Sequence, residues 1–305
     1  MTETGDASSS RSVEISVVVG SVESERSIRD CLESISISAR GRTVELIVVD
    51  ASHDVTAGLV RLHFPDVNLV SMRVGTLTPQ LWLEGYRRSS GTFVAFTTGH
   101  CVVPSDWLAD LQSALSSGAA GAGGPITLAP DKSMVDAAVY FLRYSAFMRG
   151  ASQDQHPVSE IAGDNSMYVR AEVGPHVSPS ANGFWEVNVN RRLRKAGKTL
   201  LMVPRASVAF GRSSPLSVIS RHRFAHGRHS GGWRRVEDGM SPWRIILAAP
   251  LVPFVLLGRI FKRVRAARGD VSLVVKSSPL ILWLAACWAT GEAVGALTAP
   301  DARRN

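Results

Sequence analysis

Along the first hundred residues, continuous apolar runs alternate with amphipathic segments. The run 14–20 (EISVVVG) is almost entirely apolar and closes on glycine, which is typical of a strand buried on both faces of a sheet. In the segment that follows, Ile28, Leu32 and Ile35 recur at helical spacing. The same alternation predicts further strands over 44–49, 67–71 and 92–97, and helices over 24–37, 55–63 and 79–89. This order predicts an α/β fold with a mostly parallel sheet, whose ligand binds at the carboxyl ends of the strands.

The middle of the chain is less regular. The stretch that begins at Gly118 (GAAGAGGP) predicts a flexible loop, or alternatively the approach to a strand at 126–128. Beyond it, the pattern predicts a helix over 135–148, a strongly basic helix over 186–196 that ends at Gly197, and a strand over 199–203.

The C-terminal part differs in kind, because it contains two apolar segments, 245–257 and 279–297, with Arg and Lys residues between them. A straight membrane-spanning helix needs about 20 apolar residues, and the first segment is shorter and contains Pro250 and Pro253. We therefore expect the first segment to be interfacial or re-entrant, with the basic connection on anionic cytosolic headgroups. The second segment either spans the membrane or packs on the first. The alternative is a pair of buried core helices in a soluble protein.

The amino-acid composition indicates which partners the protein binds and which cellular compartment it occupies. The 305 residues include 45% hydrophobic and 20% charged residues, which excludes global disorder. The net charge of +8 is concentrated in 221–268, beside the apolar tail, which favours a membrane surface and a phosphorylated substrate over nucleic acid. Cys31, Cys101 and Cys287 form neither a disulfide framework nor a metal-ligand spacing, so a reduced compartment is expected.

These features divide the chain into four parts. A polar leader over 1–12 is expected to be disordered, and it lacks the apolar core of a signal peptide. The α/β domain occupies 13–210, a basic connecting segment follows over 211–242, and a membrane-associated helical tail occupies 243–305. The predicted fold class is therefore an α/β domain with a C-terminal membrane-associated helical segment.

Four segments, in order, resemble family 2 glycosyltransferases. ISVVVGSVESERSIRDCLESI with ELIVVDASHDVT resembles the opening of that family. GTFVAFTTGHCVVPSDWL resembles the central segment, which normally contains Asp-x-Asp and then Pro-x-x-Trp-Leu. GDNSMYVR and FWEVNVNRRLRKAGKTLLMVPRASV resemble the acceptor-side motifs, so the resemblance covers about 13–210.

The resemblance implies a GT-A (Rossmann-like) fold, with a mostly parallel mixed sheet flanked by helices. It also implies inverting transfer of a hexose from a nucleotide-diphosphate sugar to a carbohydrate or lipid-linked acceptor of the cell envelope. Because the tail is similar to that of membrane-anchored members, the enzyme is expected at the cytoplasmic face of the membrane, in contact with phospholipid.

For the donor, the resemblance points to two acidic residues. Asp50 ends the second strand, where its carboxylate would accept hydrogen bonds from a base N–H or a ribose hydroxyl. Its alternative is an Asp that caps the turn Asp50-Ala51-Ser52. Glu23, after the first strand, stands where the family has another nucleotide contact, and its alternative is a solvated Glu at the start of a helix.

For catalysis, the resemblance points to Glu186 as the base that removes the proton from the acceptor hydroxyl. Phe184 and Trp185 would shield the carboxylate and raise its pKa. The family often has a Glu-Asp pair here, but Val187 occupies the second position, and Glu186 as a helix cap is the alternative. Trp185, together with Asp164 and Asn165 of the Gly163-Asp164-Asn165 motif, is assigned to the acceptor side, although that motif also predicts a simple Asx-turn.

The main departure from the family is Thr98-Gly99-His100, which replaces Asp-x-Asp, the motif that holds a divalent ion on the leaving diphosphate. Thr98 and His100 are therefore donor-site candidates, and His100 could ligate Mn or Mg or contact the diphosphate directly. Its alternative is a structural histidine. A second family ligand aligns with Phe210, so tight metal binding is not expected.

The basic segment 221–229 (RHRFAHGRH), which includes Arg228, would compensate by surrounding the departing diphosphate with Arg and His side chains. The alternative is a basic juxtamembrane face that binds headgroups. A rival function from another class is a catalytically inactive membrane scaffold or sugar-nucleotide binding protein of the same fold. A nucleotidyltransferase is disfavoured because the sequence lacks a Gly-rich phosphate loop near its N-terminus.

Overall fold

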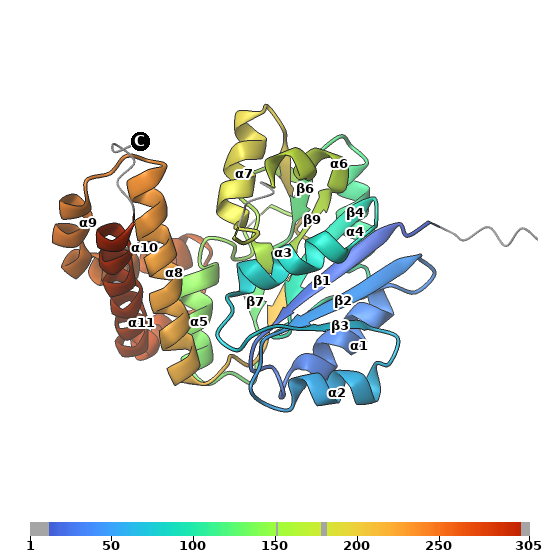
Figure 1. Cartoon of the computed structure of the whole chain (residues 1–305), viewed down its shortest axis with the longest axis horizontal. Helices are drawn as coiled ribbons and strands as arrows, with labels where there is room; N and C mark the ends of the chain where they lie inside the picture. Colours follow the sequence, from blue (N-terminus) through green and yellow to red (C-terminus); the bar gives the residue numbers. More distant parts are fainter. Residues whose placement is uncertain (1–11, 151, 178–181, 300–305) are drawn as a thin grey trace, which may run out of the picture.

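The computed structural model describes residues 12–150, 152–177 and 182–299, so almost all of the leader expected over 1–12 lies outside it. The described part consists of an α/β body and a C-terminal group of helices (Figure 1). The strands are β1 (Ile15–Ser21), β2 (Val44–Asp50), β3 (Asn68–Ser71), β4 (Phe93–Thr98), β5 (Cys101–Val102), β6 (Gly121–Gly123), β7 (Ile126–Leu128), β8 (His156–Pro157), β9 (Ser166–Val169), β10 (Leu200–Met202) and β11 (Val208–Phe210). The α-helices are α1 (Ile28–Ser38), α2 (Thr56–His63), α3 (Thr78–Arg88), α4 (Trp107–Leu115), α5 (Met134–Tyr144), α6 (Arg170–Val173), α7 (Glu186–Lys195), α8 (Leu216–Val236), α9 (Pro242–Ala248), α10 (Val252–Ala266) and α11 (Val271–Thr298). Three short 3-10 turns complete the order, η1 (Gly163–Asn165), η2 (Gly174–His176) and η3 (Ala249–Leu251).

The main sheet is mixed, with the strand order β3-β2-β1-β4-β9-β6-β10-β8. Strands β1 to β4 run parallel, as the alternating pattern predicts, whereas β9 is antiparallel to both β4 and β6. A small second sheet has the order β5-β11-β7. The parallel register places Ser21, Asp50 and Ser71 side by side at one edge of the sheet, with Thr98 at the end of β4.

The first elements form where apolar periodicity predicts them. Every residue of β1 is buried, since helices cover both faces of the sheet. Helix α1 buries Ile28, Leu32 and Ile35, the three positions at helical spacing. On the opposite face, α3 packs closely on β1, because a β-carbon on Gly85 would lie only 2.2 Å from a methyl group of Val18.

The Gly/Ala-rich stretch contains the short buried strand β6 and leads into β7 at Ile126–Leu128, so the alternative prediction is confirmed and the flexible loop is wrong. Strand β6 lies between β9 and β10 near the middle of the sheet, and all three of its residues are buried. A β-carbon on Gly121 would lie 2.9 Å from both Tyr168 and Leu200. Glycine is required here because large neighbouring side chains cross the strand, which leaves no room for another.

The C-terminal helices differ from prediction in two respects. The connecting segment expected over 211–242 is mostly the 21-residue helix α8, which packs lengthwise on α11. The basic residues expected in a connection between two apolar segments instead continue the helix α10, and the chain turns just before Asp270, whose carboxylate caps α11 at Leu273 N (2.9 Å).

Two described helices, Pro242–Ala266 and Val271–Thr298, are long and apolar enough to cross a membrane, with mean hydropathies of 1.9 and 1.6. They form a possible membrane anchor. The first exposes Trp243, Leu247, Leu251 and Phe254, each more than 60% accessible. The second is covered over its C-terminal half by the polar helix α8 (Figure 1).

Candidate active site

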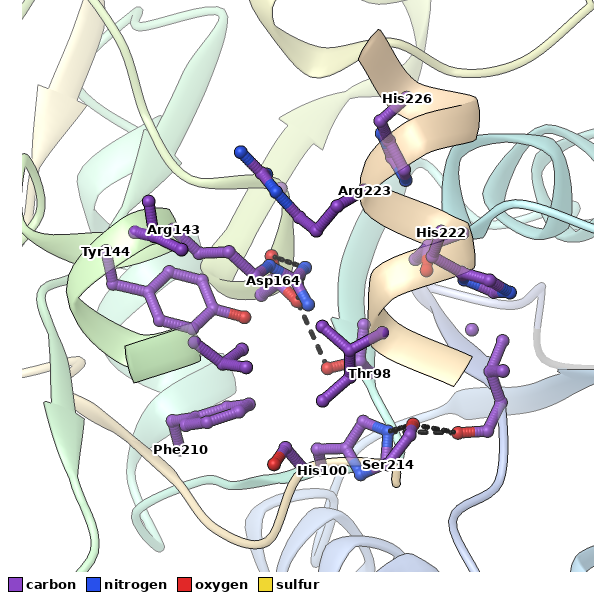
Figure 2. Close-up of a pocket in the computed structure, with 18 of the residues that line it drawn as sticks. Thr98, His100, Arg143, Tyr144, Asp164, Phe210, Ser214, His222, Arg223 and His226 are labelled. Atoms are coloured by element: carbon purple, nitrogen blue, oxygen red, sulfur yellow. Dashed lines mark hydrogen bonds and ion pairs between the residues drawn. The ribbon is translucent and has the colours of Figure 1, made fainter. Parts of the chain in front are cut away.

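A cavity of about 270 Å³ lies at the carboxyl ends of β1 and β4 (Figure 2). Its walls come from elements far apart in the sequence: α3, α5, η1, the first residue of α7, and α8. Of the residues that the sequence singles out, the cavity brings together Thr98, His100, Asp164 and Glu186. The other five lie elsewhere.

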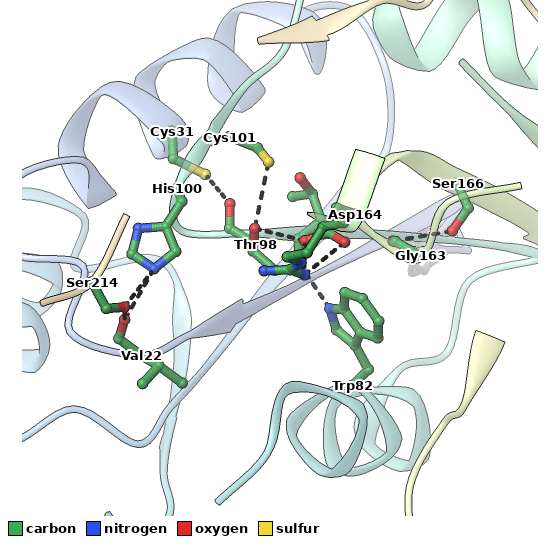
Figure 3. Close-up of polar contacts among 12 residues, drawn as sticks. Val22, Cys31, Trp82, Thr98, His100, Cys101, Gly163, Asp164, Ser166 and Ser214 are labelled. Carbon is green, nitrogen blue, oxygen red and sulfur yellow. Dashed lines mark hydrogen bonds and ion pairs between the residues drawn. The ribbon is translucent and has the colours of Figure 1, made fainter. Parts of the chain in front are cut away.

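A buried ion pair forms one wall of the cavity. Nη2 of Arg143, on α5, donates to both carboxylate oxygens of Asp164, on η1, at 2.7 and 2.9 Å. Thr98 Oγ1 donates to the same carboxylate at 3.1 Å (Figures 2 and 3). Because the Asp164 side chain is only 5% exposed, these donors replace the water that it would otherwise bind. Asp164 thus links the end of β4 to helix α5.

Glu186 begins α7 and faces the cavity across Gly163. A β-carbon on Gly163 would lie 2.5 Å from the Trp82 ring and 3.2 Å from Glu186 Cγ, so glycine allows the carboxylate to pack against the indole. Burial raises the pKa of Glu186 to about 7, the nearby Asp164 carboxylate adds to the rise, and Arg143 opposes it. A carboxylate with this pKa can take up a proton near neutral pH.

His100 is held by protein groups through both ring nitrogens. Nε2 lies 3.0 Å from the carbonyl oxygen of Val22 and 3.2 Å from Ser214 Oγ, and Nδ1 lies 3.3 Å from Ser27 Oγ (Figure 3). Burial, with the positive charge of Arg143, lowers its pKa to about 4, so the ring is neutral at pH 7. The Val22 carbonyl can only accept a hydrogen bond, so Nε2 carries the proton and acts as the donor.

The donor set does not fit a divalent ion. His100 Nε2 carries a proton toward Val22, Asp164 is paired with Arg143, and the third expected position is the buried ring of Phe210. Within the described residues, no group of three His, Cys, Asp or Glu side chains is arranged to hold a metal ion.

Helix α8 supplies the wall opposite Asp164, with His222, Arg223 and His226 directed toward the cavity (Figure 2). Burial lowers the pKa of both histidines, so the positive charge of this wall belongs to the arginine. Burial and the proximity of Arg143 lower the pKa of Arg223 to about 10, which leaves it charged at neutral pH. Arg223 Nε and the hydroxyl of Tyr144 are buried without a hydrogen-bond partner among the described residues. The buried Arg223 Nε is therefore available as a donor to an anionic ligand.

The two acidic donor candidates, Asp50 and Glu23, do not line this cavity. Asp50 accepts hydrogen bonds from Ser52 Oγ at 2.6 Å and Ser52 N at 3.3 Å, the turn-capping arrangement that was its alternative. Val218 of α8 packs on the apolar cluster beside it. Glu23 has a left-handed backbone (φ 49°) and accepts from His53 N at 2.9 Å, beside a separate surface hollow.

Three acceptor-side or diphosphate candidates also lie outside the cavity. Asn165 is fully buried and its amide bonds only protein groups: Trp107 Nε1 at 2.8 Å and the carbonyls of Pro125 and Ala206. Because its polar atoms are all occupied, Asn165 supports the core and does not reach the acceptor. Trp185 and Arg228 line a second groove between α7 and α8.

Sequence reasoning missed Arg143, Tyr144 and Trp82, and it did not single out Arg223 within the basic segment. One signal was available, because Arg143 is the only cation in an otherwise apolar helical stretch, 135–148. A charged residue on such a face needs a buried partner. Which carboxylate serves as that partner depends on the fold.

The family model of glycosyl transferase family 2 matches residues 16–173, about half of the chain. The chain belongs to this family. It is therefore a glycosyltransferase by family, and the cavity lies at the strand edge where an α/β sheet of this type binds its ligand.

Comparison with the solved structure of a TarS fragment shows the same fold, and a second structure is reported beside it. The crystal structure of S. aureus TarS 1-349 in complex with UDP is 15% identical, with a TM-score of 0.50 over 94% of this chain and 91% of that chain. The structure of GalNAc-T7 with UDP, GalNAc and Mn2+ is 13% identical, with a TM-score of 0.47 over 70% of this chain and 48% of that chain. This chain spans 55% of a longer TarS chain. No curated protein matched.

Proposed function

We propose that this protein is an inverting hexosyltransferase that uses a nucleotide-diphosphate sugar and glycosylates a cell-envelope glycan or glycolipid. The observation that carries the proposal is the position of Glu186, whose pKa of about 7 suits a general base, in one cavity with two arginines. The acceptor oxygen attacks the anomeric carbon as the bond from that carbon to the diphosphate breaks. Glu186 takes the acceptor proton, and the nucleoside diphosphate leaves with the bonding electrons.

The leaving diphosphate needs positive charge and hydrogen-bond donors, and this chain can supply them from side chains. Arg223 has an unpartnered Nε, and Arg143 and Tyr144 border the same space. Preorganised donors of this kind lower the barrier by stabilising charge that develops in the transition state. We therefore assign to Arg223 the part that a metal ion has in members with Asp-x-Asp, and we expect transfer to survive removal of Mn and Mg.

We assign the cavity of about 270 Å³ to the sugar and diphosphate of the donor, and the edge of the sheet at Asp50 to the nucleoside. Val218, on the first turn of α8, packs on the cluster of Val22 and Ala51, next to Asp50. A small outward movement of this turn would open the edge of the sheet at Asp50 to the nucleoside. Asp50 thus remains the proposed nucleoside contact in the donor complex.

The membrane proposal rests on surface chemistry. The exposed apolar side chains of Trp243, Leu247 and Phe254 lie on the same helical segment as exposed cations such as Arg259 and Lys262. This combination suits an interfacial helix on anionic lipid, at the cytoplasmic face of the membrane. Flotation with vesicles of phosphatidylglycerol, but not of phosphatidylcholine alone, is the expected result.

Purified full-length protein with radiolabelled UDP-, GDP- and dTDP-sugars tests the function directly. UDP is the first nucleotide to try, because it is named in the TarS complex. Release of sugar or transfer to envelope glycans should persist in EDTA, and NMR of the product should show inverted anomeric configuration. Retention of configuration would contradict the role of Glu186 as base.

The second candidate is a non-catalytic member that binds sugar nucleotide. It is favoured by one observation, the replacement of Asp-x-Asp by a segment in which His100 is fully occupied by protein contacts. Binding of UDP with no turnover of any donor, with or without Mn, would support this candidate over the enzyme.

A further inference from the structure

A second hollow, the α7–α8 groove, has a volume of about 820 Å³ and lies between α7, the C-terminal half of α8 and the end of α11. It adjoins the cavity at the start of α7 and within one turn of α8. Trp185 lines the groove and Glu186 lines the cavity, while His229 lines the groove and His226, one turn earlier, lines the cavity. The Trp185 ring stacks on His229 at 3.6 Å and meets His226 edge-on at 5.4 Å. The groove therefore borders the cavity of the proposed base, with the Trp185, His226 and His229 rings between the two.

The groove has the chemistry of a carbohydrate site. Trp185 and Trp233 offer broad aromatic surfaces, which pack against the apolar C–H faces of sugar rings. The amide side chains of Gln80, Asn182 and Asn188 offer donors and acceptors for hydroxyl groups. On the proposed function, the diphosphate of the donor occupies the smaller cavity, which leaves the groove for the acceptor.

The groove also has unmatched positive charge. Glu237 is the single acidic residue among its described lining residues, against Arg192 and Arg228. Arg192 is oriented by two contacts, a hydrogen bond from Nη1 to the carbonyl oxygen of His176 at 3.0 Å and its position over the Trp233 ring at 5.9 Å. No described residue forms a hydrogen bond or an ion pair with the exposed Arg228 side chain. Nε2 of His229 is buried and has no partner among the described residues.

We infer that the α7–α8 groove is the acceptor subsite and that it binds a sugar bearing an anionic group, a phosphate or a carboxylate. This inference rests on the proposed function, since it takes Glu186 as the base toward which the acceptor hydroxyl points. Arg228, which has no partner among the described residues, pairs with the anion. Arg192, whose side chain is already oriented by His176 and Trp233, adds a second positive charge. The indole rings hold the sugar that carries the charge.

The test is calorimetric titration of the full-length protein, in physiological salt, with glucose, glucuronic acid and glucose 1-phosphate. The charged sugars should bind at least ~10-fold more tightly than glucose, because a charge-assisted hydrogen bond contributes more than a neutral one. Arg228→Ala should remove most of this preference. The matched control is Arg61→Ala, an exposed arginine on α2, which removes the same charge and should leave the preference intact. Whether phosphate or carboxylate binds more tightly identifies the class of anion.

Titration with UDP in the same preparations separates this inference from the proposed function. UDP should bind wild type and Arg228→Ala equally, and it should not displace the charged sugars. If UDP binds but the charged sugars bind no better than glucose, or are displaced by UDP, the groove is not an anionic acceptor site and the proposed function stands. If UDP does not bind, the proposed function fails, and the comparison of glucose with its charged analogues still decides whether the groove takes an anionic sugar.

Discussion

A β-carbon added to Gly291 of α11 would lie 2.0 Å from the carbonyl oxygen of Phe224 on α8, far inside van der Waals contact. The neighbouring glycines make equally close approaches, Gly295 to the Arg228 carbonyl at 1.9 Å and, from α8, Gly227 and Gly231 to carbonyls of α11 at 2.0 and 1.9 Å. A buried carboxylate, Glu292, fixes the register through an ion pair with Arg234 at 2.9 Å. Since α8 carries one wall of the cavity, its packing on the apolar helix α11 positions the side chains of that wall.

We therefore expect Gly291→Ala to force α8 and α11 apart and to lower both sugar transfer and stability. Overpacking of this kind costs about 1–3 kcal/mol of unfolding free energy. The control is Gly258→Ala on α10, where the added β-carbon meets nothing within 4 Å and should be neutral or stabilising by ~0.5–1 kcal/mol through helix propensity. Thermal or urea unfolding with a parallel transfer assay measures both effects. Equal behaviour of the two variants would show that the glycine contacts do not hold α8 in place.

The same glycines explain why the sequence did not predict α8. Hydrophobic periodicity reveals helices that pack through apolar side chains, as it did for α1 with Ile28, Leu32 and Ile35. Helix α8 packs through the backbone at Gly227 and Gly231, so its contact face carries no apolar stripe. The sequence pattern also did not predict the buried strand β6, because its glycines lie at crowded positions and not in a flexible loop.

The sequence predicted those site residues that lie at strand ends or in motifs resembling the family. Thr98, His100, Asp164 and Glu186 do meet in one cavity. Partners fixed by side-chain packing were not predictable. Asp50, the nucleoside candidate, does not line the cavity, and Val218 of α8 packs on the apolar cluster beside it.

Glu186→Gln should abolish transfer and raise stability at the same time. Loss of the base should lower kcat by about 10²–10⁴-fold, with UDP affinity nearly unchanged. Burial raises the folded-state pKa of Glu186 above its ordinary value of 4.5 to about 7. Stability from this group is therefore fully present below about pH 4.5 and is lost as pH rises through about 7. At pH 8 the variant should be more stable than wild type by about 1–3 kcal/mol, and the difference should shrink toward pH 5.

Chemical denaturation at the two pH values, with Glu33→Gln as a control, measures this difference. Glu33 is an exposed glutamate on α1, with 53% of its side chain accessible, so its substitution should change neither stability nor turnover appreciably. A Glu186→Gln variant that is inactive and also less stable at pH 8 would indicate a structural role for Glu186.

Arg223→Gln should weaken the binding of the transition state more than the binding of the substrates. Arg143 is already paired with Asp164, so Arg223 supplies the free positive charge for the leaving group. We expect kcat to fall by about 10²–10³-fold, as for the loss of one preorganised donor, and Arg223→Lys to recover part of it. Steady-state kinetics with UDP titration separates kcat from affinity, with Arg61→Gln as the charge-matched control. If Arg223 had only a structural role, its substitution would lower stability, and Arg223→Lys would not be expected to recover kcat.

The pH dependence of transfer should report the ionisation of Glu186 and the effect of Asp164 on it. The rate should rise with pH through a midpoint near 7, because Glu186 accepts a proton only when ionised. Asp164→Asn removes the carboxylate that adds to the raised pKa of Glu186 and releases Arg143, whose charge opposes it. The midpoint of the surviving activity should therefore move below that of wild type, even though loss of the ion pair with Arg143 lowers stability. A midpoint that stays in place would assign the titration to a group remote from Asp164. A midpoint that rises would mean that the Asp164 carboxylate does not raise the pKa of Glu186. The explanation of the raised pKa given above would then be wrong.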